Sequence, residues 1–237
     1  MIVMQMADFK LPYSLNLGIM ESDNERRIGL EILKKIRSLQ LPLKLDEITE
    51  GRGNCFPLAI IAQLHRPDVF RNLSESIRFL ACQKDPNVLR QEIHRFMIHS
   101  KNPIILEYKR RYEEVIARID VRNWCEYWKT MVKNYEWVDY IFVQSTAWFL
   151  GLDIIIITTT STENHPYITI SRNLTDESKP CQGIPLIIGC KSQLHYQSLI
   201  PLQMGSNSRQ LLFDSPTDSI RLKISAAAQI TLIIWVH

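Results

Sequence analysis

A run of β-branched residues in the second half of the chain constrains the fold most. Residues 153–159 read Asp-Ile-Ile-Ile-Ile-Thr-Thr, so that no polar side chain interrupts the four isoleucines. A strand with one face in solvent would alternate apolar and polar residues, whereas a continuous apolar run is typical of a strand buried on both faces. The sequence therefore predicts a sheet that is covered on both sides at this strand.

Shorter apolar segments follow this run. Residues 166–170, 184–189 and 194–200 are each rich in β-branched or other apolar residues, and polar or turn-forming residues separate them. We expect each segment to be a strand. Two more short strands are expected at 220–224 and 229–236, the second because its apolar run is too short to span a membrane.

The first 150 residues carry a different pattern, in which apolar residues recur every three or four positions. This spacing places them on one face of a helix. Helices are expected at about 22–40, 55–64, 72–82, 85–97, 102–119, 122–134 and 137–150, the first opened by a capping box of Ser22 and Glu25. Helices that precede a group of strands indicate an α+β fold rather than a regular βαβ repeat.

The composition excludes several classes of protein. The 237 residues suffice for one domain with a substantial core, and the net charge of +3 is too small to indicate binding to nucleic acid. Five scattered cysteines without a CxxC pair are typical of a reducing compartment, and they support neither a disulfide framework nor a zinc site. The chain lacks an apolar run of about 18 residues, and its start lacks the features of a signal peptide. We therefore expect a cytoplasmic protein, or one delivered into a host cytoplasm if it is microbial.

Cys55 has the most informative surroundings of the five cysteines. It stands where a turn that contains Gly51 and Gly53 becomes an apolar, helix-like segment, and Pro57 suits the first helical turn. The first N–H groups of a helix have no partners within it, and the helix dipole is positive there. A thiolate at this position is stabilised, which predicts a lowered thiol pKa and a nucleophilic sulfur. An ordinary buried cysteine is the alternative.

His195 is the residue that could serve such a nucleophile as a base. It directly follows a turn and lies in the strand expected at 194–200, and the end of a strand can present a side chain at a cleft. A nucleophilic cysteine needs a base that is near in space rather than in sequence. A core histidine is the alternative reading of this residue alone.

Three blocks of sequence become informative when they are read together. Residues 52–56 read Arg-Gly-Asn-Cys-Phe, a helix that starts near Trp137 leads into the strand at 153–157, and residues 195–198 read His-Tyr-Gln-Ser. In order and spacing these blocks resemble the OTU (ovarian tumour) family of cysteine proteases, which cleave ubiquitin from its conjugates. The resemblance covers roughly residues 45–202. It implies a papain-like α+β fold in which a helical part precedes a small mixed sheet and the nucleophile lies at a helix N-terminus.

The resemblance also implies a role for each site residue. Cys55 would be the nucleophile and His195 the general base, and Gln197 would orient the imidazole ring. The oxyanion hole would be formed by backbone N–H groups at Arg52, Gly53 and Asn54. The reaction would be hydrolysis of an isopeptide or peptide bond after the C-terminal glycine of ubiquitin through a thioester, without metal or cofactor.

Two residues depart from the family's pattern. Arg52 stands where the family has aspartate, and its guanidinium could help to hold a thiolate. Gln197 stands where the family has asparagine or aspartate, although strand alternation puts it on the same face as His195. Asp46 is a second candidate for the orienting acid. The departures leave an alternative function: a catalytically impaired OTU-fold module that binds ubiquitin or another protein.

The predicted organisation has three parts. Residues 1–44 are expected to be an N-terminal helical extension packed on the domain, 45–202 the OTU-like catalytic domain, and 203–237 a C-terminal extension with short strands. We expect ubiquitin or polyubiquitin chains as partners, no nucleic acid and no membrane, and a monomeric protein.

Overall fold

The computed structural model describes residues 17–46, 53–116, 123–172, 184–191 and 195–202. The helices of this part are α1 (Leu17–Ser38), α2 (Cys55–Leu64), α3 (Pro67–Phe70), α4 (Glu75–Gln83), α5 (Pro86–His99), α6 (Pro103–Ile116), α7 (Trp124–Met131) and α8 (Tyr140–Leu150). The strands are β1 (Leu43–Leu45), β2 (Ile154–Thr158), β3 (Ile168–Ile170), β4 (Leu186–Lys191) and β5 (His195–Pro201). Apart from β1, the helices precede the strands, which confirms the predicted α+β class.

The strands form one mixed sheet in the order β1-β5-β4-β2-β3. Strands β2 and β4 run parallel, and the other neighbouring pairs are antiparallel. The isoleucine run of β2 lies between β3 and β4, and all four isoleucines are buried. The predicted strand with two buried faces is therefore confirmed.

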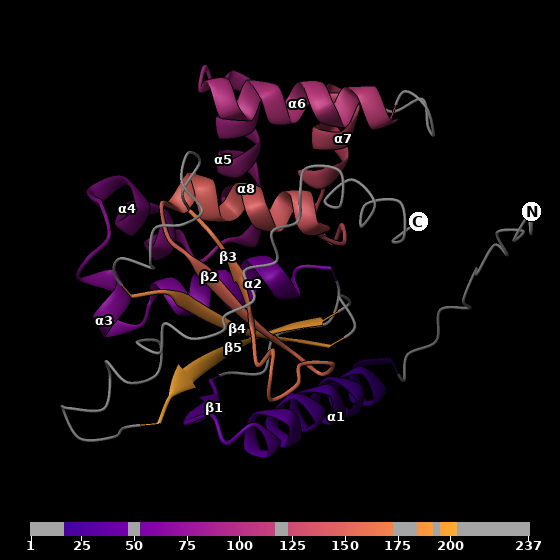
Figure 1. Ribbon diagram of the computed structural model, residues 1–237, viewed down its shortest axis with the longest axis vertical. Helices are drawn as coiled ribbons and strands as arrows, with labels where there is room; N and C mark the ends of the chain where they lie inside the picture. Colours follow the sequence, from indigo (N-terminus) through magenta and orange to yellow (C-terminus); the bar gives the residue numbers. More distant parts are fainter. Residues whose placement is uncertain (1–16, 47–52, 117–122, 173–183, 192–194, 203–237) are drawn as a thin grey trace, which may run out of the picture.

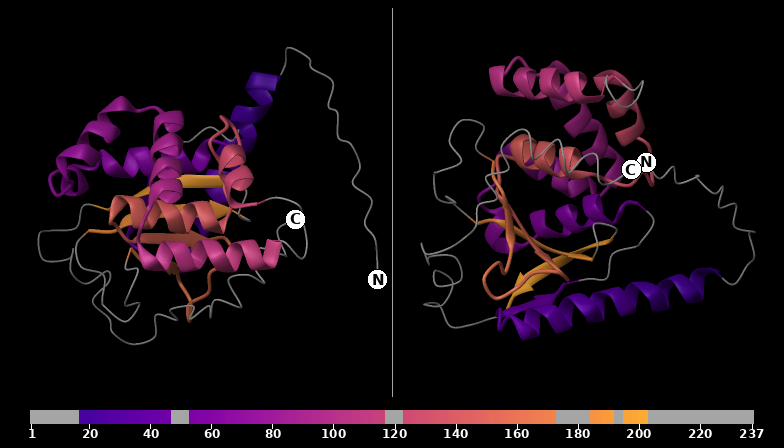
Figure 2. Two further views of the ribbon diagram at one scale, coloured as in Figure 1. Left: turned by 90° about the horizontal axis from the view of Figure 1, so that it is seen from above. Right: turned by 45° about the vertical axis from the view of Figure 1, so that its right-hand side comes forward.

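Helices cover the sheet on both sides (Figures 1 and 2). On one side, α1 packs Ile32 and Ile36 against Ile157, Ile187 and Leu199 of three strands. On the other side, α2 lies directly against β4 and β5, and α5 lies against α2. Helix α2 is therefore enclosed between the sheet and the helical layer, which places its first residue in the interior of the molecule.

The close approach of α1 depends on a glycine in the sheet. A Cβ atom at Gly189 would lie 2.5 Å from Cγ2 of Ile32, closer than two carbon atoms can pack. Gly189 therefore leaves the space that Ile32 fills, and α1 is seated directly on β4.

Several element ends differ from the prediction. Helix α1 begins at Leu17, so Ser22 lies inside it and the predicted capping box is wrong. Helix α8 begins at Tyr140 rather than Trp137, because the carboxylate of Asp139 accepts a hydrogen bond from the N–H of Phe142 and caps the helix. Strand β4 continues to Lys191, two residues past the predicted end.

Other predictions meet the limits of the described residues. The expected strands at 220–224 and 229–236, and the C-terminal extension 203–237, lie outside them. The domain boundaries stay predictions. Helix α1 packs on the sheet, and β1, which includes residues on both sides of the predicted boundary after residue 44, pairs with β5. Within the part of the chain described above, no helix has the length and apolar character that a bilayer span requires.

Candidate cysteine active site

Cys55 is the first residue of α2, as predicted, and its side chain is 1% exposed. Burial raises the pKa of its thiol, whereas backbone N–H groups of Tyr196, Phe56 and Cys55 itself lower it, as does the charge of Arg90. Burial has the larger effect, so the pKa lies above its ordinary value. The predicted lowering of the thiol pKa is therefore wrong for this structure. The helix end does direct N–H groups at the sulfur, but a thiolate there would also lose its hydration.

His195 begins β5 and is 2% exposed. Burial lowers the pKa of its imidazole to about 4, because a charged ring in the interior would lose its hydration. The side-chain nitrogen of Gln197 lies 2.5 Å from Nε2 of the ring. A half-turn of the amide exchanges its nitrogen and oxygen and lets the carbonyl accept a hydrogen bond from Nε2–H, which leaves Nδ1 unprotonated and able to act as a base. Gln197 thus lies where a residue that orients the ring must lie.

The start of α2 meets the start of β5. The N–H that reaches the Cys55 sulfur from β5 belongs to Tyr196, whose nitrogen is bonded to the carbonyl carbon of His195. Beside this contact, the ring of Phe56 packs edge-on against the ring of Tyr196 at a centroid distance of 5.0 Å. The fold therefore brings Cys55 against the peptide bond that joins His195 to Tyr196.

The turn before Cys55 is held in a defined conformation. Gly53 has a φ of +75°, and a Cβ atom there would lie 2.0 Å from the carbonyl oxygen of Tyr135. The side-chain oxygen of Asn54 accepts hydrogen bonds from the N–H of Tyr135 (3.2 Å) and from Nε of Arg90 (3.3 Å). Its nitrogen donates to the side-chain oxygen of Asn134 at 2.5 Å. Arg52 lies outside the described residues, and an oxyanion hole at residues 52–54 stays a prediction.

Arg90, on α5, is the site residue that the sequence analysis missed. It is 0% exposed, and its guanidinium carbon lies 5.3 Å from the centroid of the Phe142 ring. Burial lowers the pKa of Arg90 to about 10, against the opposing charges of Glu136 and Cys55. A signal was present, because Arg90 shares a helical stripe with the buried apolar residues Ile93 and Met97. A cation on such a stripe must be paired or hydrogen-bonded.

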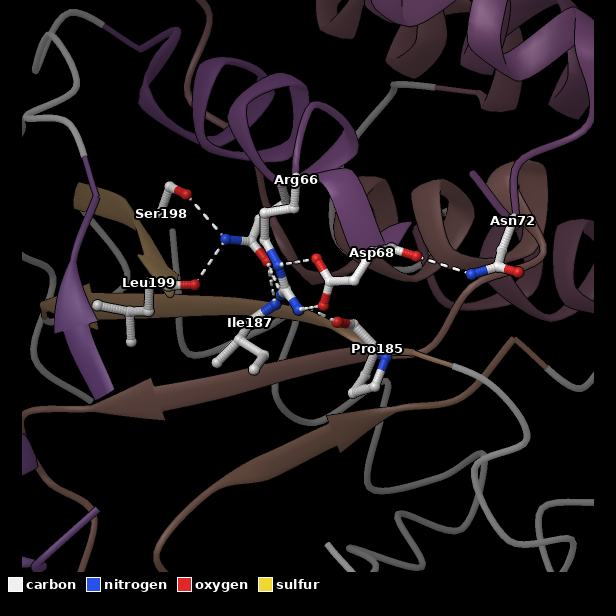
Figure 3. Close-up of polar contacts among 8 residues, drawn as sticks. Arg66, Asp68, Asn72, Pro185, Ile187, Ser198 and Leu199 are labelled. Carbon is white, nitrogen blue, oxygen red and sulfur yellow. Dashed lines mark hydrogen bonds and ion pairs between the residues drawn. The ribbon is translucent and has the colours of Figure 1, made fainter. Parts of the chain in front are cut away.

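The other end of α2 is held by a second polar network, centred on Gln63, whose partners Arg66, Ile187, Ser198 and Leu199 are labelled in Figure 3. The side chain of Gln63 is fully buried and donates to Oγ of Ser198 at 2.8 Å and to the carbonyl of Leu199 at 2.7 Å. Its oxygen accepts from Arg66 and from the N–H of Ile187, both at 2.7 Å. All its hydrogen-bonding positions are therefore filled, by Arg66 between α2 and α3 and by groups of two strands.

Asp46 belongs to this second network rather than to His195. Its Oδ2 accepts a hydrogen bond from Oγ of Ser198 at 2.9 Å, and its N–H donates to the carbonyl of the same residue at 3.0 Å. This pairing fixes the start of the segment that leads to Cys55. Asp46 therefore attaches that segment to β5.

The fold and site together define a class: an α+β protein with a cysteine at a helix start and a histidine at the adjoining strand start. Comparison with models of known protein families gives no match, and comparison with curated proteins gives none.

Solved structures that resemble this chain are OTU domains. The OTU of Hazara virus, solved bound to ubiquitin, is 15% identical with a TM-score of 0.39, and the match covers 70% of this chain and 86% of that one. The OTU domain of OTUD1 is 14% identical with a TM-score of 0.43, covering 76% and 99%. The viral OTU protease of Dera Ghazi Khan virus is 16% identical with a TM-score of 0.40, covering 67% and 81%.

Proposed function

We propose that this protein is a thiol-dependent deubiquitinase, which hydrolyses isopeptide or peptide bonds after the C-terminal glycine of ubiquitin. One observation carries the proposal: Cys55, at the start of α2, lies against the backbone of β5 next to His195, whose ring contacts Gln197. A cysteine, a histidine and an amide in this relation form a nucleophile, a base and a residue that orients the base. The three sequence blocks supply the substrate class.

The proposed reaction proceeds through an acyl-enzyme. His195 takes the proton of the Cys55 thiol as the sulfur attacks the carbonyl carbon of the glycine, and N–H groups at the start of α2 stabilise the oxyanion. His195 then gives this proton to the leaving amine, and the C–N bond breaks to leave a thioester. A water molecule, deprotonated by His195, hydrolyses the thioester and restores the thiol.

The resting site supports general-base attack rather than a preformed ion pair. The pKa of Cys55 is raised and that of His195 is lowered to about 4, in both cases mainly by burial. Both shifts favour the uncharged forms at neutral pH. The proton is therefore expected to move as the sulfur attacks, and the acid limb of kcat/KM should lie well below the ordinary histidine pKa of 6.5.

A ubiquitin probe with a C-terminal electrophile tests the proposal. We expect a covalent adduct with the wild-type protein, loss of the adduct in Cys55→Ala, and at least about a hundredfold slower labelling in His195→Ala. Cys82→Ala and Cys125→Ala are matched controls, because both thiols are exposed and should not affect labelling. An adduct at another cysteine would overturn the assignment. Binding of the probe without any adduct would instead support the non-catalytic ubiquitin-binding module.

A further inference from the structure

Arg90 contacts two segments at the start of α2. Its guanidinium donates to the carbonyl of Gly53 at 2.8 Å and, as described, to the side chain of Asn54. It also donates to the carbonyls of Met131, at 2.8 Å, and of Glu136. One side chain on α5 therefore joins the turn before Cys55 to the segment between α7 and α8.

Both of these segments contain a residue with a left-handed backbone. Gly53 has a φ of +75°, which glycine adopts readily, whereas Tyr135 has a φ of +63°, which is unfavourable for a residue with a Cβ atom. The Tyr135 carbonyl occupies the space that a side chain at Gly53 would need. Such conformations persist only where the surrounding structure enforces them, commonly at functional sites. The hydrogen bonds of Arg90 on either side of this contact are suited to enforce it.

We propose that Arg90 is a positioning residue of the cysteine site, which holds Gly53 and Asn54 so that the first N–H groups of α2 face the sulfur of Cys55. The contribution of Arg90 to catalysis rests on the proposed function, whereas its effect on Cys55 can be measured without a substrate. Arg52 is the guanidinium near Cys55 in the sequence that could favour a thiolate, but it lies outside the described residues. In the described residues, Arg90 is placed to act in that way.

The charge of Arg90 acts on Cys55 in the same direction as the N–H groups, since both favour a thiolate. Glu136 opposes the effect, because its carboxylate interacts with Arg90. Loss of Arg90 should therefore raise the thiol pKa further. Among the other titratable groups, Tyr196 of β5 interacts electrostatically with Cys55, and Cys190 of β4 and Asp139 before α8 act in turn on Tyr196. These groups, and His195 next to Tyr196 in β5, stay in place in the variants described below.

The pH dependence of Cys55 alkylation by iodoacetamide, followed by mass spectrometry, tests this role. In Arg90→Met we expect the midpoint to move to higher pH and the rate at pH 7 to fall by about tenfold or more. The exposed thiols Cys82 and Cys125 are internal standards whose rates should not change. Unchanged alkylation of Cys55 would overturn the proposal.

Arg66→Met is the matched control. Arg66 is also a buried arginine, 7% exposed, but it lies at the far end of α2 and pairs with Asp68 at 2.7 Å. Its loss should destabilise the protein and leave the Cys55 midpoint unchanged. Arg90→Lys keeps the positive charge but loses the forked geometry of the guanidinium, so it replaces Arg90→Met in the alkylation experiment if that variant does not fold. A rise of the midpoint in Arg66→Met equal to that in the Arg90 variants would overturn the proposal.

Turnover of a ubiquitin substrate separates this inference from the proposed function. Arg90→Lys should lower kcat by about a hundredfold and leave KM nearly unchanged, because the oxyanion forms only after the substrate has bound. A rise in KM with unchanged kcat would overturn the positioning role. If the wild-type protein forms no ubiquitin adduct, the proposed function fails, and the alkylation experiment still decides whether Arg90 acts on Cys55.

Discussion

The two ends of α2 are both fixed by buried arginines, but they are attached to different parts of the molecule. At the N-terminal end, Arg90 of α5 binds the turn before Cys55 from the helical layer. At the C-terminal end, Gln63 binds the helix to β4 and β5, and Arg66, just beyond the helix, bonds to the Gln63 side chain and to the carbonyl of Pro185 before β4 (Figure 3). The N-terminal attachment determines the conformation of a turn, and the C-terminal attachment determines the position of a helix on a sheet.

The chemistry of the two networks reflects this difference. Three of the four groups that accept from Arg90 are backbone carbonyls, two in loops and one at the C-terminal end of α7, so the guanidinium bonds to carbonyls that lie outside the regular helix and strand ladders. Gln63 bonds to the N–H of Ile187 and the carbonyl of Leu199, one residue beyond the last pair of β4 and β5, and its effect is to fix where α2 lies along β5. Loss of the first network should therefore change reactivity, and loss of the second should mainly change stability.

The largest effect is expected at the N-terminal turn, from Gly53→Ala. The new Cβ would meet the Tyr135 carbonyl at 2.0 Å while the residue stays at a φ of +75°. The strained backbone and the overpacking together should cost about 4 kcal/mol in the free energy of unfolding, measured by urea denaturation. Gly151→Ala is the matched control, because that glycine has a φ of +65° with no atom within 4 Å of its Cβ position. It should cost only about 1 kcal/mol; equal losses would show that the contact with Tyr135 is unimportant.

At the C-terminal end we expect a smaller effect, from Gln63→Met. The change removes four hydrogen bonds and leaves the N–H of Ile187 and the carbonyl of Leu199 buried without their side-chain partner. It should lower the free energy of unfolding by about 3 kcal/mol. Gln144→Met is the control, since that glutamine has two hydrogen bonds within the described residues, to the carbonyl of Ser171 and from the hydroxyl of Tyr140, and about 1 kcal/mol is expected.

The reactivity of Cys55 separates Gln63→Met from Arg90→Met. The pH midpoint of Cys55 alkylation should be unchanged in Gln63→Met, because the groups that reach the sulfur do not include Gln63. A shift of the midpoint would show that the two ends of α2 are coupled. It would then be wrong to assign reactivity to the N-terminal network and stability to the C-terminal network.

Local signals explain which features could be predicted. The isoleucines of β2 and the cap at Asp85, which accepts from the N–H of Asn87, depend on residues near in sequence. So does Gly151, which ends α8 with a left-handed backbone. Strand β1 has only three residues and exists through its pairing with β5, so no local pattern could reveal it.

In the candidate site, too, some features follow from local sequence and others depend on the tertiary fold. The positions of Cys55 and His195 at the starts of their elements follow from turn and strand patterns. Their protonation does not, because it depends on how much water the packed helices exclude from them. The contacts of Arg90 join segments about 40 residues apart, which only the tertiary fold brings together.

The smallest effect is expected in the pH dependence of the free energy of unfolding. His195, beside the N-terminal end of α2, and Asp68, beyond its C-terminal end, should change it over different pH ranges. The pKa of His195 is lowered from 6.5 to about 4 by burial, so between these values the unfolded chain binds a proton that the folded protein does not. Stability should therefore fall as the pH drops from 6.5 to about 4. His195→Gln should flatten this slope more than His94→Gln, because His94 is less buried and its pKa is also lowered. An equally steep slope in His195→Gln would show that the imidazole is not kept neutral by burial.

Asp68 should act in a lower window. Burial raises the pKa of its carboxyl, but the hydrogen bond and charge of Arg66 outweigh burial and bring the pKa below 3.8. Its contribution is therefore complete above pH 3.8 and is lost as the pH falls through the folded-state value. Urea denaturation of Asp68→Asn should change the slope mainly below this pH, whereas His195→Gln should change it mainly between about pH 4 and 6.5. If Asp68→Asn changed the slope mainly in the His195 range, titration at one end of α2 would alter the packing at the other.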